Sequence, residues 1–268
     1  MEVKFNNVSF SYGDNVIFDK FNCFINSGLI SGIIGASGSG KSTMLDLIDG
    51  LVTCSHGCVS VGSYKVSDSI RKNIGYLFQF SEDQIFNSSV YKEIEFGLKC
   101  FKCDNIDSRV RDSIKLVGFD ESILSINPYK LSNGEKRKVA IASVLAYDPD
   151  ILILDEPTVG LDNISKNGLM KLLKDLKKSG KTIIIVSHDI DFIHKFVDYV
   201  YLLKNGKIYL EGNKYDVLSN EKAMSECGLV VPNILHFSNL VYDKKGVKIG
   251  YRDELNDLIK DVYRYAKW

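Results

Sequence analysis

A glycine-rich loop between an apolar strand and a helix constrains this chain more than any other feature. The run Ile30–Ile34 predicts a buried strand, and Ser42–Asp49 predicts the start of a helix. Glycines let the backbone between them turn its N–H groups inward, and the helix N-terminus adds partial positive charge. The segment therefore predicts a phosphate-binding loop in an α/β fold, formed by Gly35, Ala36, Ser37, Gly38, Ser39, Gly40, Lys41, Ser42 and Thr43.

Two side chains of this loop have predicted roles of their own. Lys41 is placed to reach the outer phosphates of a nucleotide, and the Ser42 hydroxyl is placed to hold Mg²⁺. The alternative is a Gly/Ser turn beside a surface lysine, which loses weight as the rest of the chain is considered. We therefore predict that the chain binds ATP or GTP together with magnesium.

Composition limits the class of protein. The chain has 268 residues, 45% of them hydrophobic and 25% charged, which predicts one large domain, alone or with an appendage. The formal net charge of zero gives no global attraction to nucleic acid, and we expect no nucleic-acid partner. No apolar run is long enough to span a bilayer, and Met1–Asn6 lacks a signal-peptide core. We expect a cytoplasmic protein, held at a membrane only through a partner.

The cysteines do not predict a metal site. In the cytosol they should be reduced thiols. Two pairs could be imagined as zinc ligands, but their spacing is loose and each lies in a stretch with another explanation. We therefore expect no resident metal at Cys54, Cys58, Cys100 and Cys103, nor at Cys23 and Cys227.

Alternating strand and helix patterns predict a parallel sheet with an antiparallel addition. Ile151–Leu154 and Thr182–Val186 are apolar throughout, as in strands buried on both faces, and Ile164–Lys178 between them has helical spacing. Val3–Phe10 and Val16–Ile25 predict a hairpin before the phosphate-binding loop. Further strands are expected at His56–Val61, Ile74–Gln79, Val200–Leu203 and Ile208–Leu210.

The stretch of about residues 83–147 is predicted to be a helical insert. Val90–Leu98 and Asp107–Val117 have helical spacing. Ser132–Glu135 has the form of a capping box and precedes an apolar helix over Val139–Ala146. After about residue 215 the pattern loosens, and an amphipathic helix is expected over Arg252–Tyr265.

Several polar residues follow predicted strands or turns and are candidates for chemistry. Asp155 ends a buried strand and could bind Mg²⁺, and Glu156 could take a proton from an attacking water. His188 could contact a γ-phosphate or orient that water, and Gln79 could contact Mg²⁺ or water. The Tyr12 ring could stack on adenine. Taken singly, these are an ordinary strand-end turn, a structural histidine and common polar or aromatic residues.

Together these motifs resemble the nucleotide-binding domain of ABC transporters. The resemblance covers about residues 1–215 and implies that the chain hydrolyses ATP. It also implies a head-to-tail dimer, with each ATP held between the Walker A loop of one subunit and the signature of the other. The matching motifs are Walker A at Gly35–Thr43, Gln79, the signature Leu131–Glu135, Walker B at Ile151–Glu156, the D-loop Gly160–Asp162 with Asp162, and the switch histidine His188.

The signature departs from the family's commonest sequence, Leu-Ser-Gly-Gly-Gln. Asn133 stands for a glycine and Glu135 for the glutamine, while Ser132 and Gly134 remain. Asparagine tolerates the left-handed backbone region, so we expect these four residues still to bind the partner's ATP. The change favours pairing with a paralogue and two chemically unequal sites, although pairing of the chain with itself stays open.

A narrower resemblance is to the ATPases of energy-coupling-factor transporters, which power the uptake of vitamins and transition metals. It rests on residues 77–86, Val139–Ala146 and Gly228–Pro232. With Phe80 directly after Gln79, the segment is more similar to that of the second of the two paralogous ATPases. The resemblance implies a membrane coupling subunit, a substrate-binding membrane subunit, a location at the cytoplasmic face of the cell membrane, and a dimerisation region over residues 216–268. The alternative for that region is a terminal helix packed on its own domain.

In that setting Ile85 and Phe86 are expected to be exposed apolar contacts with the membrane partner. Three other functions stay open. An ATPase of another ABC importer or exporter has the same motifs. A soluble ABC protein acting on DNA or the ribosome usually has long coiled coils or two such domains, which this chain lacks. A sensor that does not hydrolyse nucleotide is disfavoured by Glu156 and His188. The transported solute cannot be named, because another subunit selects it.

Overall fold

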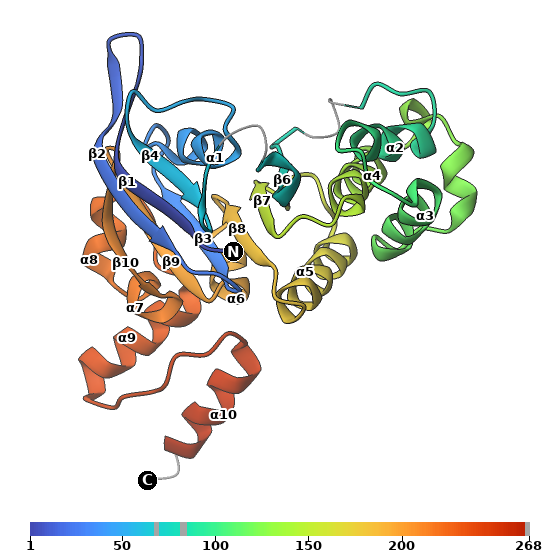
Figure 1. The fold of residues 1–268 in the computed structure, drawn as a ribbon. Coiled ribbons are helices and arrows are strands. Elements are labelled where there is room, and N and C mark those ends of the chain that lie inside the picture. Colours follow the sequence, from blue (N-terminus) through green and yellow to red (C-terminus); the bar gives the residue numbers. More distant parts are fainter. Residues whose placement is uncertain (67–69, 81–84, 266–268) are drawn as a thin grey trace.

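The computed structural model describes residues 1–66, 70–80 and 85–265. It is an α/β structure with two sheets, a helical region on one side and a helical C-terminal segment on another (Figure 1). The strands are β1 (Val3–Tyr12), β2 (Asn15–Ile25), β3 (Ile30–Gly35), β4 (His56–Val61), β5 (Tyr64–Lys65), β6 (Ile74–Leu77), β7 (Ile151–Asp155), β8 (Thr182–Val186), β9 (Tyr199–Lys204) and β10 (Lys207–Asn213).

Helices cover the sheets and form the region at the right of Figure 1. They are α1 (Lys41–Asp49), α2 (Val90–Cys100), α3 (Ile106–Leu116), α4 (Asn133–Ala146), α5 (Asn163–Lys178), α6 (Ile190–Phe196), α7 (Lys214–Leu218), α8 (Glu221–Glu226), α9 (Asn233–Lys245) and α10 (Leu255–Tyr265). Short 3-10 helices are η1 (Arg71–Asn73), η3 (Glu121–Ser125) and η4 (Pro128–Lys130). No helix in the described part of the chain is long and apolar enough to cross a membrane.

The larger sheet has six strands in the order β10-β9-β3-β8-β7-β6. Neighbouring strands from β9 to β6 are parallel, and β10 is antiparallel at the edge. Because successive side chains of a strand point to opposite faces, Ile153 of β7 lies in one apolar core while Leu152 and Leu154 lie in the other. Burial on both faces explains the apolar runs in the sequence and confirms the predicted parallel sheet.

The smaller sheet is antiparallel, in the order β2-β1-β4-β5. It packs with α1 on one face of the larger sheet, where Phe5, Phe18 and Met44 share the first core. The Tyr201 hydroxyl of β9 donates to the Phe24 carbonyl of β2 at 2.7 Å and ties the two sheets together. The first strand is two residues longer than the predicted Val3–Phe10, and Tyr12 is the last residue of β1.

Helices α2, α3 and α4 enclose a separate apolar core, which includes Ile85, Val90 and Ile94. The expectation that Ile85 is exposed was therefore wrong, because its side chain is only 5% exposed. Its neighbour Phe86 is 58% exposed and meets the Phe96 ring edge-on, with 5.0 Å between centroids. Residues 81–84 of the segment used for the narrower resemblance lie outside the described residues.

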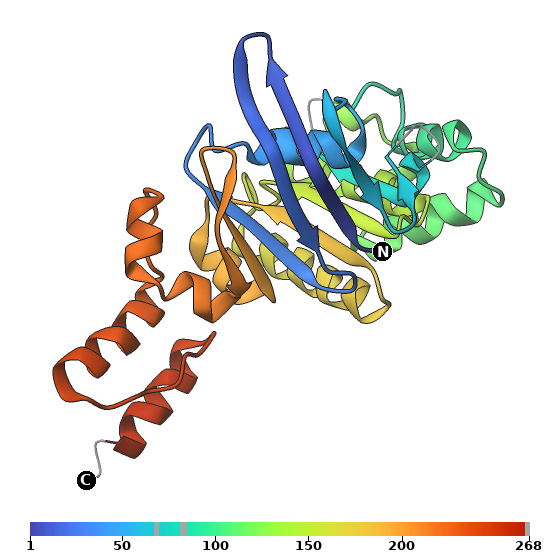
Figure 2. The same cartoon turned by 60° about the vertical axis from the view of Figure 1, so that its left-hand side comes forward.

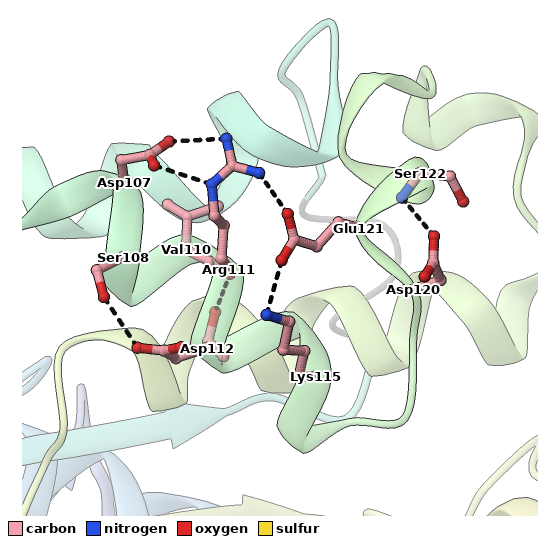
Figure 3. A network of polar contacts seen from close by, with 10 residues as sticks. Asp107, Ser108, Val110, Arg111, Asp112, Lys115, Asp120, Glu121 and Ser122 are labelled. Carbon is pink, nitrogen blue, oxygen red and sulfur yellow. Dashed lines mark hydrogen bonds and ion pairs between the residues drawn. The ribbon is translucent and has the colours of Figure 1, made fainter.

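A polar network fastens α3 to η3 on the surface of this helical region (Figure 3). The Arg111 guanidinium pairs with Asp107 one turn earlier, at 2.8 Å, and also with Glu121 of η3. Lys115 Nζ reaches the other oxygen of Glu121 at 2.7 Å. These side chains are partly exposed, so the network orients η3 more than it stabilises the fold.

The C-terminal helices α9 and α10 extend away from the sheets in both views (Figures 1 and 2). The segment before α10 is fixed by Asp253, whose Oδ1 accepts from Lys214 Nζ at 2.6 Å and from the Tyr215 hydroxyl at 2.7 Å. His194 Nε2, at the end of α6, lies 3.7 Å from the same oxygen. On α10, Leu258 is buried.

Candidate nucleotide-binding and active site

A cleft of about 380 Å³ opens where four parallel strands end. Parallel strands bring their carboxyl ends to one edge of a sheet, and here the loops after β3, β6, β7 and β8 meet. Of the predicted site residues, this arrangement brings together most of the phosphate-binding loop, both acids, the glutamine and the histidine. The cleft is lined by Ile17, Ser37, Gly38, Gly40, Lys41, Ser42, Thr43, Gln79, Asp155, Glu156, Val186 and His188.

The loop after β3 has a backbone that only glycine adopts easily. Gly38 and Gly40 have φ of 76° and 105°. Gly35 has φ of 154°, and a Cβ built there would lie 2.4 Å from the Leu203 carbonyl oxygen. The chain therefore passes too close to β9 for a side chain at Gly35, which explains the spacing of the glycines.

Lys41 is buried at the start of α1, and its ammonium group lies inside the loop. Nζ donates to the carbonyl oxygens of Gly35 and Ala36, at 2.8 Å each. Burial lowers the pKa of Lys41, and the nearby charges of Glu156 and Asp155 act in the opposite direction. The lysine is thus held near the acids at the end of β7, two strands away in the sheet.

Asp155 is the last residue of β7, and Glu156 follows it. Burial, with the charge of Glu156 next, raises the pKa of Asp155 to about 6. Glu156 has φ of 48°, in the left-handed region, which costs a side-chain-bearing residue on the order of 1–2 kcal/mol. Such strain is typical of functional positions and persists only where the surroundings fix it.

The Glu156 carboxylate is fixed by the end of β8. Oε2 accepts from the Ser187 hydroxyl at 2.9 Å, and Oε1 accepts from the His188 backbone N–H at 2.8 Å. His188 Nε2 lies 3.7 Å from Oε1, and its side chain is more than half exposed in the cleft. A carboxylate and an imidazole side by side in a cleft are suited to activate and orient an attacking water.

Oxygen donors in the cleft fit a magnesium ion. The Ser42 hydroxyl, the Gln79 amide and the Asp155 carboxylate all line it, and Mg²⁺ prefers such ligands. The strand predicted over Ile74–Gln79 is shorter in the structure, where β6 ends at Leu77. Gln79 lies in the turn that follows. The pairing with β7 stops at Leu77 and Leu154, so Gln79 is free of the sheet ladder.

Sequence reasoning missed three residues that shape this site. Ile17 of β2 adds an apolar side chain to the cleft, and Ser187 holds Glu156. Arg137 of α4 is 1% exposed and donates to the carbonyl oxygens of Gln79 and Glu156, at 3.0 and 2.6 Å. Arg137 precedes the predicted apolar helix Val139–Ala146, and arginine is seldom buried, so the sequence did not indicate its burial.

Other predicted residues lie outside the cleft lining. Tyr12 is 49% exposed, and its ring meets Phe10 edge-on at 4.8 Å. Asp162 caps α5, with Oδ1 accepting from the Ser165 N–H at 2.7 Å. That hydrogen bond lowers the pKa of the Asp162 carboxyl.

The signature residues begin α4 away from this cleft. Ser132 and Glu135 form the predicted capping box. Oε2 of Glu135 accepts from the Ser132 N–H at 2.9 Å and from its hydroxyl at 2.7 Å. Asn133 and Gly134 are in the first helical turn without positive φ, so the expected use of asparagine's left-handed tolerance was wrong. The helix already begins at Asn133, earlier than the predicted Val139.

Comparison with known proteins agrees with this geometry. The family model described as ABC transporter matches residues 18–159. The energy-coupling factor transporter ATP-binding protein EcfA3 of Oenococcus oeni is 38% identical, covering 94% of this chain and 91% of that protein. The corresponding EcfA2 of Streptococcus sanguinis is 37% identical, covering 91% of this chain and 93% of that protein.

Solved structures are similar over most of the chain. That of cbiO1 from Clostridium perfringens, described as part of the ABC transporter complex cbiONQ, matches with a TM-score of 0.74 and 34% identity, covering 88% of this chain and 98% of that one. A dimeric ATP-binding cassette in a post-hydrolysis state, bound to ADP and Pi, matches with a TM-score of 0.70 and 32% identity, covering 79% and 98%. These matches confirm the family resemblance and the fold. The chain therefore belongs to the ABC transporter family, and within it to the energy-coupling factor transporter ATP-binding proteins.

Proposed function

We propose that this chain binds ATP with Mg²⁺ in the cleft and hydrolyses it as an ATPase subunit of an energy-coupling-factor importer. The transported solutes we propose are vitamins or transition-metal ions. The observation that carries the proposal is that Lys41, Gln79, Asp155, Glu156 and His188 come from four loops into one cleft. Each of these residue types has a separate task in phosphoryl transfer to water.

The phosphates would lie against the loop formed by residues 35–43. Lys41 Nζ would exchange its carbonyl partners for the outer phosphate oxygens, and the start of α1 would add backbone N–H donors. Ser42, Gln79 and Asp155 would hold Mg²⁺, which supplies charge neutralisation on the phosphates. We keep stacking of Tyr12 on adenine as part of the proposal, since its ring is half exposed at the end of β1.

Glu156 would act as the general base. Ser187 and the His188 N–H hold its carboxylate at the edge of the cleft, where it can accept the proton of an attacking water. The His188 imidazole stands beside the same oxygen and is exposed to the cleft, which suits it to contact the γ-phosphate. Both roles follow from position, because both residues line the cleft.

A second ABC ATPase would complete each site with its signature, and this chain would in turn offer Ser132, Asn133, Gly134 and Glu135 to the partner's ATP. The dimeric relative bound to ADP and Pi supports a paired arrangement. The carboxylate of Glu135 already engages the Ser132 hydroxyl, which sets this signature apart from one with glutamine. We therefore propose a paralogue as the partner, two unequal sites, and a D-loop role for Asp162 across the interface.

Residues 1–215 would form the nucleotide-binding domain, with the helical insert near 83–147, and residues 216–268 the dimerisation region. Support for the latter is the exposed apolar surface of α9 and α10, where Phe237, Leu255 and Ile259 are 43%, 61% and 41% exposed. These side chains line a groove between the two helices and α6. Apolar side chains at this exposure are typical of an interaction surface.

The helical region would contact an integral-membrane coupling subunit, which works with a substrate-binding membrane subunit. Phe86 and Phe96 form an exposed aromatic pair in the helical region, and such a pair is suited to receive an apolar segment of a partner. The protein would then act as a peripheral subunit at the cytoplasmic face of the cell membrane. The same surface would serve an ATPase of another ABC importer or exporter.

The test is hydrolysis by the assembled complex with single substitutions. Glu156→Gln should keep ATP binding and lower turnover about 10²- to 10⁴-fold, because the amide cannot accept a proton. Lys41→Ala should instead weaken ATP binding, measured by titration calorimetry. Wild-type turnover by Glu156→Gln would refute the assignment of the base. Copurification of membrane subunits separates a transporter from a soluble ABC protein.

A further inference from the structure

We propose that Arg137 is a positioning residue for the general base, an inference that rests on the proposed function. The residue is 1% exposed, and its guanidinium lies where three segments meet. Nη2 donates to the Glu156 carbonyl oxygen at 2.6 Å, Nε to that of Pro157 at 3.1 Å, and Nη1 to that of Gln79 at 3.0 Å. One side chain of α4 thus binds the peptide of the base and the turn that carries Gln79.

The peptide at Glu156 needs such support because of its left-handed backbone. The Glu156 N–H donates to the Val186 carbonyl oxygen at 2.9 Å, and Arg137 binds the carbonyl on the other side of the same residue. With both backbone groups fixed, the direction of the side chain from Cα is set. Ser187 and His188 then receive a carboxylate that is already aimed at them.

A planar guanidinium is suited to this task in a way that lysine is not. Its donors diverge in a fixed fork, so one group can bind several carbonyl oxygens at once. The arrangement favours a role in orientation over a simple gain in stability.

Arg137 also connects two parts of the catalytic cycle. It is on the same helix as the signature residue Ser132, which begins α4. Movement of the Gln79 turn against the membrane partner, or of α4 toward the partner's ATP, therefore acts on the peptide of Glu156 through one side chain. Glu156 is then correctly oriented only when α4, the Gln79 turn and the segment after β7 keep these contacts with Arg137.

The experiment compares Arg137→Lys and Arg137→Met in the assembled complex, with Arg109→Met as the matched control. Arg109 is in the same helical region and donates to the carbonyl oxygens of Asp104 and Ala146, away from the cleft. We expect kcat for ATP to fall about 10- to 100-fold in both Arg137 variants, with KM within about two-fold of wild type. The control should keep its kcat.

A second readout does not depend on hydrolysis. If the base is released, the His188 amide loses its acceptor, so its hydrogen exchange should quicken in Arg137→Lys but not in Arg109→Met. If Arg137→Met fails to fold, Arg137→Lys decides the question. Unchanged kcat and unchanged exchange at His188 in a folded Arg137→Lys would overturn the inference. A Glu156→Gln complex that still hydrolyses ATP would instead refute the proposed base, and the exchange result would still report on positioning.

Discussion

Ile85 and Phe86 are adjacent in the sequence, but Ile85 is buried and Phe86 is exposed. A serine substitution at each position therefore distinguishes a core residue from a residue of a contact surface. Ile85 is 5% exposed among the apolar side chains of α2, α3 and α4. Truncating a buried isoleucine costs about 2–5 kcal/mol, and a serine hydroxyl adds to that cost. At about 2–4 °C per kcal/mol for a chain of this size, a loss of about 3 kcal/mol lowers Tm by about 6–12 °C.

Phe86→Ser removes an exposed ring and its edge contact with Phe96, which is worth about 0.5–1.5 kcal/mol. Its Tm should therefore fall by only a few degrees, about 1–6 °C by the same conversion. Thermal unfolding of the isolated chain measures both values, and transport by the assembled complex measures coupling. We expect Phe86→Ser to bind ATP normally and to transport poorly. A Phe86→Ser variant that unfolds as readily as Ile85→Ser, or that transports at the wild-type rate, would refute the reasoning.

Two further predictions concern the signature and the response to acid. Asn133→Gly combined with Glu135→Gln should raise ATP hydrolysis at the partner's site, because the double change frees the Ser132 hydroxyl from the Glu135 carboxylate. The turnover of a mixed complex measures the effect. An unchanged turnover would contradict the prediction. Burial lowers the pKa of His194 in the folded chain below the ordinary histidine value of 6.5. The unfolded chain therefore binds a proton at His194 more readily than the folded chain does. The free energy of unfolding should decline as the pH falls below 6.5. The charged groups that face His194 are Asp253, Lys214, Asp191 and Lys195. His194→Gln should make the decline shallower, as measured by urea unfolding from pH 7 to 5. An equally steep decline in this variant would contradict the assignment to His194.

The sequence predicted the parts of the fold that follow from burial on both faces. Strands such as Ile151–Asp155 are apolar throughout because both sides of the sheet are covered, and the loop at 35–43 needs glycine for its backbone. The carboxyl ends of parallel strands meet, so the positions of Asp155 and His188 after such strands already implied one site. The local sequence was sufficient for all of these features.

Features decided by packing between distant segments could not be predicted in the same way. Ile85 lies outside a helix, so no period indicated which of Ile85 and Phe86 points inward. Arg137 is buried where α4 meets the segments that follow β6 and β7, and its own segment does not indicate that contact. The left-handed backbone of Glu156 is imposed by its partners and has no glycine or asparagine to mark it.

The carboxylate of Asp253 limits how far this chain can be shortened. It accepts from Lys214 and Tyr215 and faces the buried ring of His194. Truncation after residue 215 would remove this counter-charge from Lys214, a residue that is only 8% exposed in the intact chain. It would also remove the apolar side chains of α9 and α10 that line the groove beside α6. An engineered minimal ATPase should therefore keep Asp253, and a split of the chain into two separately produced pieces should be made elsewhere than at residue 215.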